Sequence, residues 1–460
     1  MLHSFPMMIA NSVGGGGYII EGSGLFNGST GYLTQTLGTA TNRKKWTAHF
    51  VLKIGEKGDA AILVADTGNV GGIDFSTGQL RYWEYSGSFL IHLATTALFR
   101  DYSGFLVVDI AYDSTQATAA DRVTIYANGV ELTDFTATTY PSLNFESRMN
   151  GAVQHRIGAT QTPSNYYNGY GARVAFIDGQ ALDPTSFGSV TDDGFWSISD
   201  VSGLDFGDNG FLLEGGSAIS AGTDSSGNSN NFTKTGTITA TSDSPTNSDD
   251  GYGNYATMNP LNSHANTTLS QGNLDVDASV ANNRGAASTI PMSSGKWYWE
   301  ATISSGSING SRDIGICGTD SNFIGTSSSL DDIGLSAVGW LPVDATLRHL
   351  TNSTSYGTTG STGAVVMFAL DMDAQKLWIG KDGTWFTSGG VGVPDAGTNA
   401  APTSAVSYTW PDAALAAVTV QATRGVTYNF GATDFAHAIG AGNDTEGFLP
   451  INTANLPTPD

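Results

Sequence analysis

Short segments rich in β-branched and aromatic residues recur along the chain, and several alternate between apolar and polar positions. Each is bounded by Gly, Asp, Asn or Ser, the residues that favour tight turns. This pattern predicts half-buried β-strands, in which every second side chain faces a core. In the first half of the chain the predicted strands are Thr47–Ile54, Ala60–Asp66, Gln79–Tyr85, Gly104–Asp113 and Arg122–Gly129.

The same pattern resumes in the second half. Its predicted strands are Lys296–Ile303, Asp313–Gly318, Ala364–Asp373, Lys376–Gly383 and Gly425–Gly431. No apolar stripe has the period of a helix over a useful length, apart from single turns near Asp183–Phe187 and Ala413–Ala417. The predicted fold class is therefore all-β, with two antiparallel, jelly-roll-like β-sandwich domains in tandem.

Composition places the boundaries between these domains. Four glycines at Gly14–Gly17 separate residues 1–19, a predicted N-terminal arm, from a first sandwich over residues 20–235. Residues 236–254 are mostly Ser, Thr, Asp and Gly with little apolar surface to bury, which predicts a linker. The second sandwich and a C-terminal tail occupy residues 255–460.

Charge and cysteine content narrow the partners and the compartment. The 460 residues include 19 basic and 42 acidic side chains, a net charge of −23, which repels nucleic acid and anionic membranes. Cys317 is the only cysteine, so no intrachain disulfide can form. The first residues lack the basic segment of a signal peptide and no stretch is apolar enough to span a membrane, so we expect synthesis in a cytoplasm without membrane insertion.

Exposed aromatic side chains are the candidates for ligand contact, because a flat ring can stack on the apolar side of a sugar. Tyr82, Trp83 and Tyr85 are neighbours in a predicted strand, where consecutive residues point to opposite faces. Core packing is the alternative interpretation for them. A second set, predicted to lie in a loop, is open between the same two interpretations: Tyr166, Tyr167, Asn168 and Tyr170. Trp385 follows a predicted Asp382-Gly383 turn, where it could reach a partner.

The first half resembles the concanavalin A-like lectin and laminin-G-like superfamily. The resemblance rests on the segments Gly24–Leu33, Asn42–Lys53, Phe99–Leu132, Asn168–Gly188 and Asp224–Phe232. Such domains can bind calcium through loop oxygens, and Asp224, Asn228 and Asn230 supply such oxygens here. The alternative is a turn in which these side chains cap their own backbone.

The second half resembles SPRY domains, which are bent sandwiches that present loops to protein partners. This resemblance rests on Lys296–Ile303, the IGICG segment at 314–318, Val338–Trp340, Phe368–Phe386 and Tyr428–Gly431. The tandem order, the segment Ala256–Asn262 and the closing residues 447–460 are similar to virion-associated proteins of tailed bacteriophages, especially marine ones. That resemblance implies a fibre, spike or decoration protein on the particle.

Catalytic chemistry has little support in the sequence. Glycanases of the lectin fold need two carboxylates facing one bond, but Asp109 and Asp113 are four strand residues apart, roughly 13 Å. Asp371 and Asp373 precede a turn, where acids are usually solvated. No histidine pair has the spacing of a zinc site, and no serine lies in a nucleophile elbow.

These observations predict a non-enzymatic virion protein that adheres to a glycan or protein of the host surface. Its expected partners are other virion proteins, met through the N-terminal arm, and further copies of itself. Two alternatives remain open at this point. The chain is a structural brace of a capsid or tail, or it is a polysaccharide depolymerase.

Overall fold

The structure is a computed structural model that divides into two compact units, Met1–Asn254 (unit 1) and Tyr255–Asp460 (unit 2). It describes residues 17–55, 58–66, 71–280, 282–306, 313–325, 329–330, 336–386, 407–421, 424–437 and 447–457. Both units are built from antiparallel β-sheets, which confirms the predicted fold class. No helix formed by these residues has the length and apolar character needed to cross a membrane.

The first sheet of unit 1 has eight strands in the order β10-β9-β8-β3-β13-β1-β18, with β16 paired to β13. Its central strands β3, β8 and β13 are buried on both faces, which matches their long apolar runs. The strands are β1 Ser23–Asn27, β3 Lys45–Ile54, β8 Leu106–Asp113, β9 Val123–Ala127, β10 Val130–Glu131, β13 Asn168–Asp178, β16 Phe211–Glu214 and β18 Ile238–Thr241.

The second sheet of unit 1 also has eight strands, in the order β11-β7-β6-β5-β4-β12-β2-β17. Strand β6 alternates strictly, with its even-numbered residues from 80 to 84 buried and its odd-numbered residues more exposed. The strands are β2 Tyr32–Thr36, β4 Ala60–Asp66, β5 Gly71–Ser76, β6 Gln79–Tyr85, β7 Phe89–Leu98, β11 Phe135–Thr139, β12 Gln154–Ile157 and β17 Thr233–Thr235.

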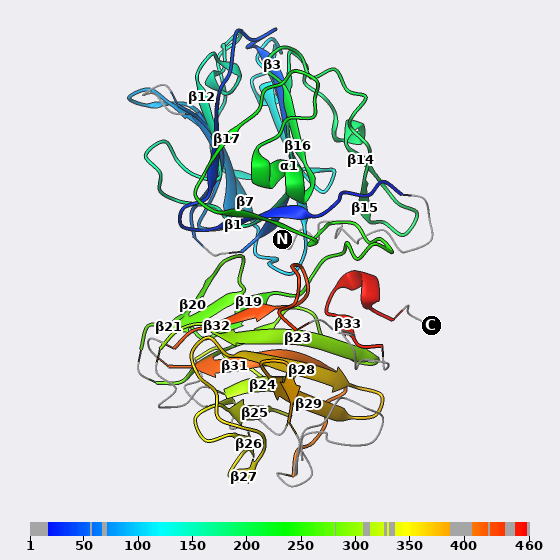
Figure 1. The fold of residues 1–460 in the computed structure, drawn as a ribbon. Coiled ribbons are helices and arrows are strands. Elements are labelled where there is room, and N and C mark those ends of the chain that lie inside the picture. The colour runs from blue at the N-terminus through cyan, green and yellow to red at the C-terminus, as the bar shows by residue number, and fades with distance from the viewer. Residues whose placement is uncertain are drawn as a thin grey trace. The chain divides into compact units, whose positions relative to one another are not determined.

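These two sheets pack face to face in unit 1, with β7, β12 and β17 in one layer and β3 and β16 in the other (Figure 1). Stacked and edge-on rings fill the space between them. The Trp46 ring lies 5.1 Å from that of Tyr112 and 5.4 Å from that of Tyr82. The short elements are the hairpin β14 Gly188–Val190 with β15 Trp196–Ile198, helix α1 Gly215–Ala221, and 3₁₀ turns at Ala120–Arg122, Arg148–Asn150 and Pro184–Ser186.

Unit 2 contains a seven-stranded sheet in the order β19-β22-β31-β24-β25-β26-β27 and an eight-stranded sheet in the order β20-β21-β32-β23-β28-β29-β30 with β33 parallel to β23. In the first sheet the strands are β19 Met258–Ser263, β22 Arg284–Ser288, β24 Asp313–Gly318, β25 Val338–Leu341, β26 Thr346–His349, β27 Asn352–Ser355 and β31 Ala414–Val420. In the second they are β20 Thr267–Ser270, β21 Asp275–Ala278, β23 Lys296–Ile303, β28 Val365–Asp371, β29 Lys376–Lys381, β30 Thr384–Trp385, β32 Val426–Asn429 and β33 Leu449–Pro450. A 3₁₀ turn at Thr453–Asn455 follows.

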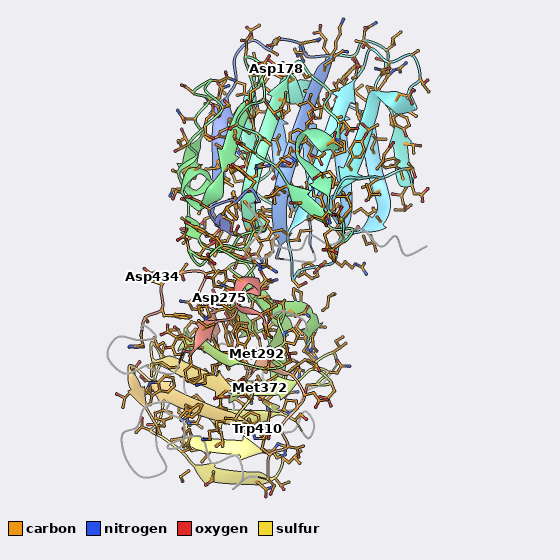
Figure 2. All side chains as sticks on the ribbon, turned by 90° about the vertical axis from the view of Figure 1, so that its right-hand side faces the viewer. Asp178, Asp275, Met292, Met372, Trp410 and Asp434 are labelled. Carbon is orange, nitrogen blue, oxygen red and sulfur yellow. The ribbon has the colours of Figure 1, made fainter. Side chains whose placement is uncertain are left out.

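The core of unit 2 holds Met292 and Met372 together with a stacked pair of rings, Trp299 and Phe368, whose centroids are 5.2 Å apart. Figure 2 labels both methionines among the side chains of this unit. Two core tryptophans satisfy their indole N–H on backbone oxygens. Trp297 donates to Ser294, and Trp340 donates to Tyr356.

The ten predicted strands all exist, with ends that differ by at most two residues. The turn predicted near Asp183–Phe187 is the 3₁₀ turn at Pro184–Ser186, where the Asp183 side chain accepts from the amide of Thr185. The turn predicted near Ala413–Ala417 is wrong, because Ala414–Val420 is a fully buried strand. Its backbone pairs with β22 on one side and with β24 on the other, and this sheet pairing overrides the helix propensity of its alanines.

The predicted linker at 236–254 is also wrong, because this segment belongs to unit 1. Residues Ile238–Thr241 form β18, which pairs with β1, and Ile238 packs into the core. After β18, the carboxylate of Asp243 accepts a hydrogen bond from the ammonium of Lys53 at 3.0 Å, and both side chains are almost fully buried. The polar side chains of this segment form buried hydrogen bonds and do not make it a flexible linker.

The predicted N-terminal arm falls mainly on residues 1–16, which lie outside the described residues. Its last part packs on unit 1. The hydroxyl of Tyr18 donates to the carboxylate of Glu214, and the Arg173 guanidinium lies 5.3 Å from the Tyr18 ring centroid. The ordered fold of unit 1 therefore begins before residue 20, where the arm was predicted to end.

The Asp243→Ala variant tests the structural role of the supposed linker. Removal of one partner leaves the Lys53 ammonium buried without its counter-ion, so we expect unit 1 to lose about 3 kcal/mol of stability. Calorimetry of the full chain measures this as a fall in the melting temperature of the unit 1 transition. Asp249→Ala, at an exposed position of the same segment, is the matched control and should change little. Equal, small effects of both substitutions would contradict the account.

Candidate functional site

Strand β6 separates the first predicted aromatic cluster into two faces. Tyr82 points into the core and is fully buried, so it cannot stack on a ligand. Trp83 and Tyr85 point outward from the second sheet of unit 1, and Tyr85 keeps 41% of its surface exposed. The two-residue period thus leaves the outward pair as the candidate contact residues.

The indole of Trp83 is held in a fixed position on the sheet. A Cβ atom built on its cross-strand neighbour Gly72 would lie 3.1 Å from the ring, so the indole lies directly against the glycine backbone. The indole N–H donates to a carboxylate oxygen of Asp74 at 2.9 Å. Arg81 holds the same carboxylate through two bonds of 2.8 Å each. Trp83 is therefore a half-exposed, immobilised ring.

Strand β7 adds two more rings beside Trp83. His92 lies opposite Trp83 in the sheet, and Phe89 lies opposite Tyr85. The Phe89 ring is 45% exposed and stacks on His92 with a centroid distance of 4.1 Å, while Tyr85 meets Phe89 edge-on at 5.4 Å. We call this outward set the Trp83 face; its members are Asp74, Arg81, Trp83, Tyr85, Phe89 and His92.

His92 is the titratable group of the Trp83 face. Burial beneath its neighbours and the positive charge of Arg81 lower the pKa of the imidazole below its ordinary value. Its Nε2 atom is buried and has no hydrogen-bond partner among the described residues. The ring is therefore neutral at pH 7, and it presents an aromatic surface without a fixed charge.

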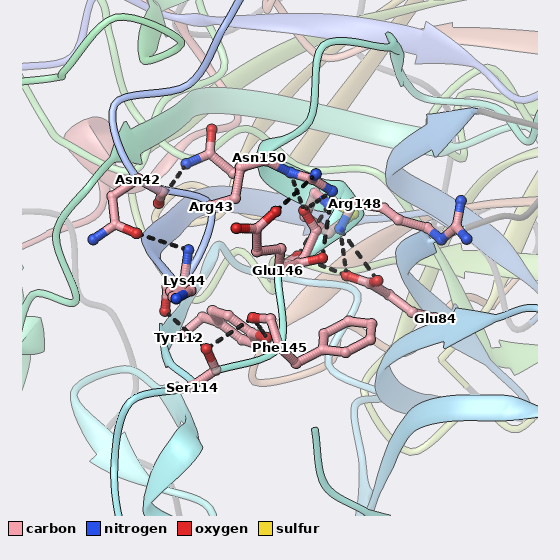
Figure 3. A network of polar contacts seen from close by, with 12 residues as sticks. Asn42, Arg43, Lys44, Glu84, Tyr112, Ser114, Phe145, Glu146, Arg148 and Asn150 are labelled. Carbon is pink, nitrogen blue, oxygen red and sulfur yellow. Dashed lines mark hydrogen bonds and ion pairs between the residues drawn. The ribbon is translucent and has the colours of Figure 1, made fainter. Parts of the chain in front are cut away.

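The inward side chain between Trp83 and Tyr85 anchors the strand that carries them. Glu84 is buried, and its carboxylate accepts from the hydroxyls of Tyr82 and Ser147. It also accepts from the backbone N–H of Arg148 (Figure 3). Burial raises the pKa of Glu84 above its usual range, while these hydrogen bonds oppose that shift. They lock β6 to the loop that follows β11.

That loop is itself tied to the opposite sheet at the same end of the sandwich. The Arg43 guanidinium donates to the backbone oxygen of Ser147, and the hydroxyls of Tyr112 and Ser114 donate to the backbone oxygen of Phe145 (Figure 3). The network therefore connects the two layers of unit 1. The network holds the register of β6 through contacts in the interior of the sandwich, and the Trp83 face lies on the outer side of the same sheet.

A further carboxylate closes the end of the sandwich where β13 stops, at Asp178 (Figure 2). It accepts from the backbone amides of Thr41, Asn42 and Asn209. The side chain of Asn150 donates to it as well. Although burial favours the neutral acid, these donors hold the pKa of Asp178 below its usual value, so its role is to join loops.

Of the second aromatic cluster, Tyr166 and Tyr167 lie in the predicted loop, whereas Asn168 and Tyr170 belong to a strand. Strand β13 begins at Asn168, and the side chains of Tyr167, Asn168 and Tyr170 are almost fully buried. The hydroxyl of Tyr167 donates to the backbone oxygen of Lys53, and the Tyr170 ring lies 5.3 Å from the Lys53 ammonium. These three residues pack inside the sandwich, so the prediction that they contact a ligand is wrong. Tyr166 is half-buried at the surface.

In unit 2, Trp385 is half-buried and joins an aromatic cluster on the outward side of the second sheet. Its ring packs edge-on against Tyr298 at 6.1 Å. Phe435 meets the same tyrosine at 4.8 Å, and the nearby Glu300 accepts from the amides of residues 436 and 437. Packing on the sheet accounts for the position of Trp385.

The predicted calcium loop is closed by its own hydrogen bonds. The carboxylate of Asp224 accepts from the amides of Leu212, Ser226 and Asn230. The side-chain amides of Asn228 and Asn230 turn their NH₂ groups toward backbone oxygens, including that of residue 210. A cation site needs oxygens, so this donor set does not fit calcium, and the structure matches the alternative of a capped turn.

The acidic candidates for catalysis are not assembled into a pair. Asp109 is fully buried beside His49, with 2.6 Å between Oδ1 and Nδ1. Asp113 bonds Thr115, Gln116 and Lys45 at the edge of a hollow of about 230 Å³ outside β8 and β9. Across the described residues, no group of three His, Cys, Asp or Glu side chains is placed to hold a metal ion.

Sequence reasoning identified Trp83 and Tyr85 but missed the other four residues of the Trp83 face, including Arg81 on the same strand. Asp74, Phe89 and His92 come from strands on either side of β6, and only strand pairing brings them beside Trp83. The sequence did contain a signal for Phe89. The short turn from Ser86 to Ser88 separates two strands that are rich in aromatic residues, and such a turn predicts a hairpin in which Phe89 lies next to Tyr85.

Comparisons with known proteins identify no family for the chain. No family model and no curated protein matches the chain. Among solved structures, the chain is similar to the SPRY domain of human HERC1, with 13% identity and a TM-score of 0.27 over 37% of this chain and 96% of that chain. It is also similar to a native heptameric SAP-like pentraxin from Limulus polyphemus, with 14% identity and a TM-score of 0.29 over 41% and 100%. Both TM-scores are low, so neither likeness supports a statement about the fold or the ligands of this chain.

A titration tests the electrostatics of the Trp83 face. We expect His92 to titrate below the ordinary histidine value of 6.5, because burial and Arg81 both disfavour the charged ring. The Arg81→Gln variant removes one of the two causes and should move the midpoint upward. Proton NMR of the imidazole signals measures it, with His92→Gln to assign the resonance. A midpoint at or above 6.5 in the unsubstituted chain would refute this description.

Proposed function

We propose that the chain is a non-enzymatic adhesion protein that binds a surface glycan through the Trp83 face. The observation that carries this proposal is the Trp83 ring, half-exposed, seated on Gly72 and fixed by the Asp74 carboxylate. A ring held flat on a sheet loses little conformational entropy when a sugar stacks on it. The hydrogen bond to Asp74 therefore prepares Trp83 for a planar apolar ligand.

The neighbours of Trp83 supply the other half of sugar recognition. Tyr85 and Phe89 extend the apolar surface, while the Arg81 guanidinium offers a polar group at its edge. A pyranose has an apolar face and polar hydroxyl groups. Aromatic rings with polar groups around them match such a ligand better than they match a purely apolar protein patch. This combination favours a glycan over a protein as the occupant, and protein binding is an outcome of the test below.

The setting proposed for this activity is the surface of a tailed bacteriophage particle, as a fibre, spike or decoration protein. Support comes from the resemblance of the tandem order and of Ala256–Asn262 to virion proteins. Immunogold labelling of purified particles with an antibody against unit 2 tests the setting. Label on the particle surface supports it. Absence of label, with the chain detected only in the lysate, would overturn it.

Binding to an array of bacterial O-chains and capsular polysaccharides tests the activity. We expect saturable binding, and we expect Trp83→Ala to weaken it by about 2 kcal/mol, roughly thirtyfold, because the ring on which the sugar stacks is lost. The melting temperature should hardly change, since Trp83 is outside the core. Leu143→Ala, at a side chain that is 54% exposed elsewhere on unit 1, is the matched control and should bind normally.

Two results would contradict the proposal. If no polysaccharide binds while a host surface protein does, the occupant is a protein. If Trp83→Ala binds as well as the unsubstituted chain, the site lies elsewhere. A parallel assay for new reducing ends separates adhesion from the depolymerase alternative, because an adhesin releases none.

A further inference from the structure

Strand register places the Trp83 face in a longer row of side chains on the outward side of the sheet, in which Val64 and Arg156 are themselves buried. Arg156 pairs with Thr34 on one side and with Val64 on the other, Val64 pairs with Gly72, and Gly72 pairs with Trp83. Because directly paired residues share a face, these side chains cross the sheet as one line at right angles to the strands. In order, the line runs through Thr34, Arg156, Val64, Gly72, Trp83 and His92.

A second aromatic group stands at the far end of this line. The rings of Tyr32 and Tyr166 are half-buried with their centroids 6.3 Å apart, and the guanidinium carbon of Arg156 lies 5.1 Å from the Tyr32 centroid. Tyr32 is on β2, the neighbour of β12, and it shares the outward face with Thr34. We call Tyr32, Tyr166 and Arg156 the Tyr32 site.

The distance between the Trp83 face and the Tyr32 site determines how long a ligand must be to contact both. Strand β6, which bears Trp83, is three strand positions from β12, which bears Arg156. Neighbouring strands are about 4.8 Å apart, so the separation is roughly 14 Å. One sugar ring stacked on Trp83 cannot reach the Tyr32 site, whereas a chain of sugars laid across the strands can.

Charge along this line differs from that of the whole chain. The net charge of the protein is −23, and near the line the Arg81 guanidinium faces the carboxylates of Asp74 and Asp59, which leaves Arg156 as the cation that has no acidic partner among the described residues. Arg156 is only 8% exposed, and among the described residues it makes no ion pair. It donates to the backbone oxygens of Thr160 and Gln161 and to the side-chain oxygen of Gln154, and its Nε atom is buried without a partner among the described residues.

A buried guanidinium without a counter-ion is electrostatically unfavourable, and an anion held nearby relieves that cost. Positive potential beside two aromatic groups thus complements a polymer that has both sugar rings and acidic substituents. Carboxylate, sulfate and phosphate groups share this chemistry.

We propose that the occupant is an extended acidic glycan chain that runs across the strands from the Trp83 face to the Tyr32 site. This inference rests on the proposed function, because it names the class of glycan and adds a second subsite to the same face. Tyr32 and Tyr166 contact sugars beyond the one stacked on Trp83, and Arg156 provides the field that favours acidic substituents.

The test uses the bound polysaccharides from the array and a ladder of their fragments, from disaccharide upward, prepared by partial acid hydrolysis. We expect the strongest binders to be acidic, with affinity that rises with fragment length and falls with added salt. Tyr32→Ala should lower the affinity for long fragments on the order of tenfold and leave short fragments unaffected. Trp83→Ala should weaken both. Tyr252→Ala, a half-buried tyrosine elsewhere in unit 1, is the matched control.

Several results would overturn this inference while leaving the proposed function in place. These are binding to neutral polysaccharides only, equal affinity for the shortest and longest fragments, or an unchanged affinity of Tyr32→Ala for long fragments. Absence of binding to any polysaccharide would instead remove the proposed function together with this extension. The melting temperature of Tyr32→Ala separates loss of contact from loss of fold. Acidic fragments that carry only carboxylate, only sulfate or only phosphate then identify the substituent.

Discussion

The two-residue period of strand β6 is the constraint on which the proposed site depends. Tyr82 and Glu84 must face the core while Trp83 and Tyr85 face outward, and a shift of one residue would exchange them. A buried carboxylate makes such a shift costly, because Glu84 would lose the donors Ser147 and Arg148 on the neighbouring loop. The interior network therefore determines which aromatic residues reach the surface.

Buried polar groups perform the same task elsewhere in unit 1. Asp178 ties three loops to the end of β13, and Asp243 pairs with Lys53 across the outward side of the first sheet. The chain has one cysteine and no disulfide, so hydrogen-bonded carboxylates take the part that covalent links play in other small β-domains. These groups fix loops that have little apolar surface of their own.

The strands and the fold class could be predicted from the sequence because period and turn residues are local signals. The linker prediction failed because Ser, Thr and Asp dominate residues 236–254, and only the distant partners β1 and Lys53 show that this segment is buried. The prediction that Asn168 and Tyr170 lie in a loop failed for a related reason. Gly169 looks like a turn residue, but a Cβ there would lie 2.3 Å from the backbone oxygen of Lys53, so the glycine permits close packing inside the sheet.

The candidate site was predicted in part. Trp83, Tyr85 and Tyr166 were identified from their residue types, and all three lie at the surface of unit 1. Their relation to one another was not predictable, because it depends on the order of strands between β7 and β2 and on register at each pairing. Asp74 and Arg156 carry no sequence signal that distinguishes them from other surface charges.

A structure of the chain bound to an oligosaccharide tests the central claim most directly. The account predicts a sugar ring stacked on the indole of Trp83, beside the Asp74 and Arg81 pair, on the outward face of β5, β6 and β7. Sugar density over the loops of unit 2 or in the hollow outside β8 and β9, with the Trp83 indole uncovered, would contradict it.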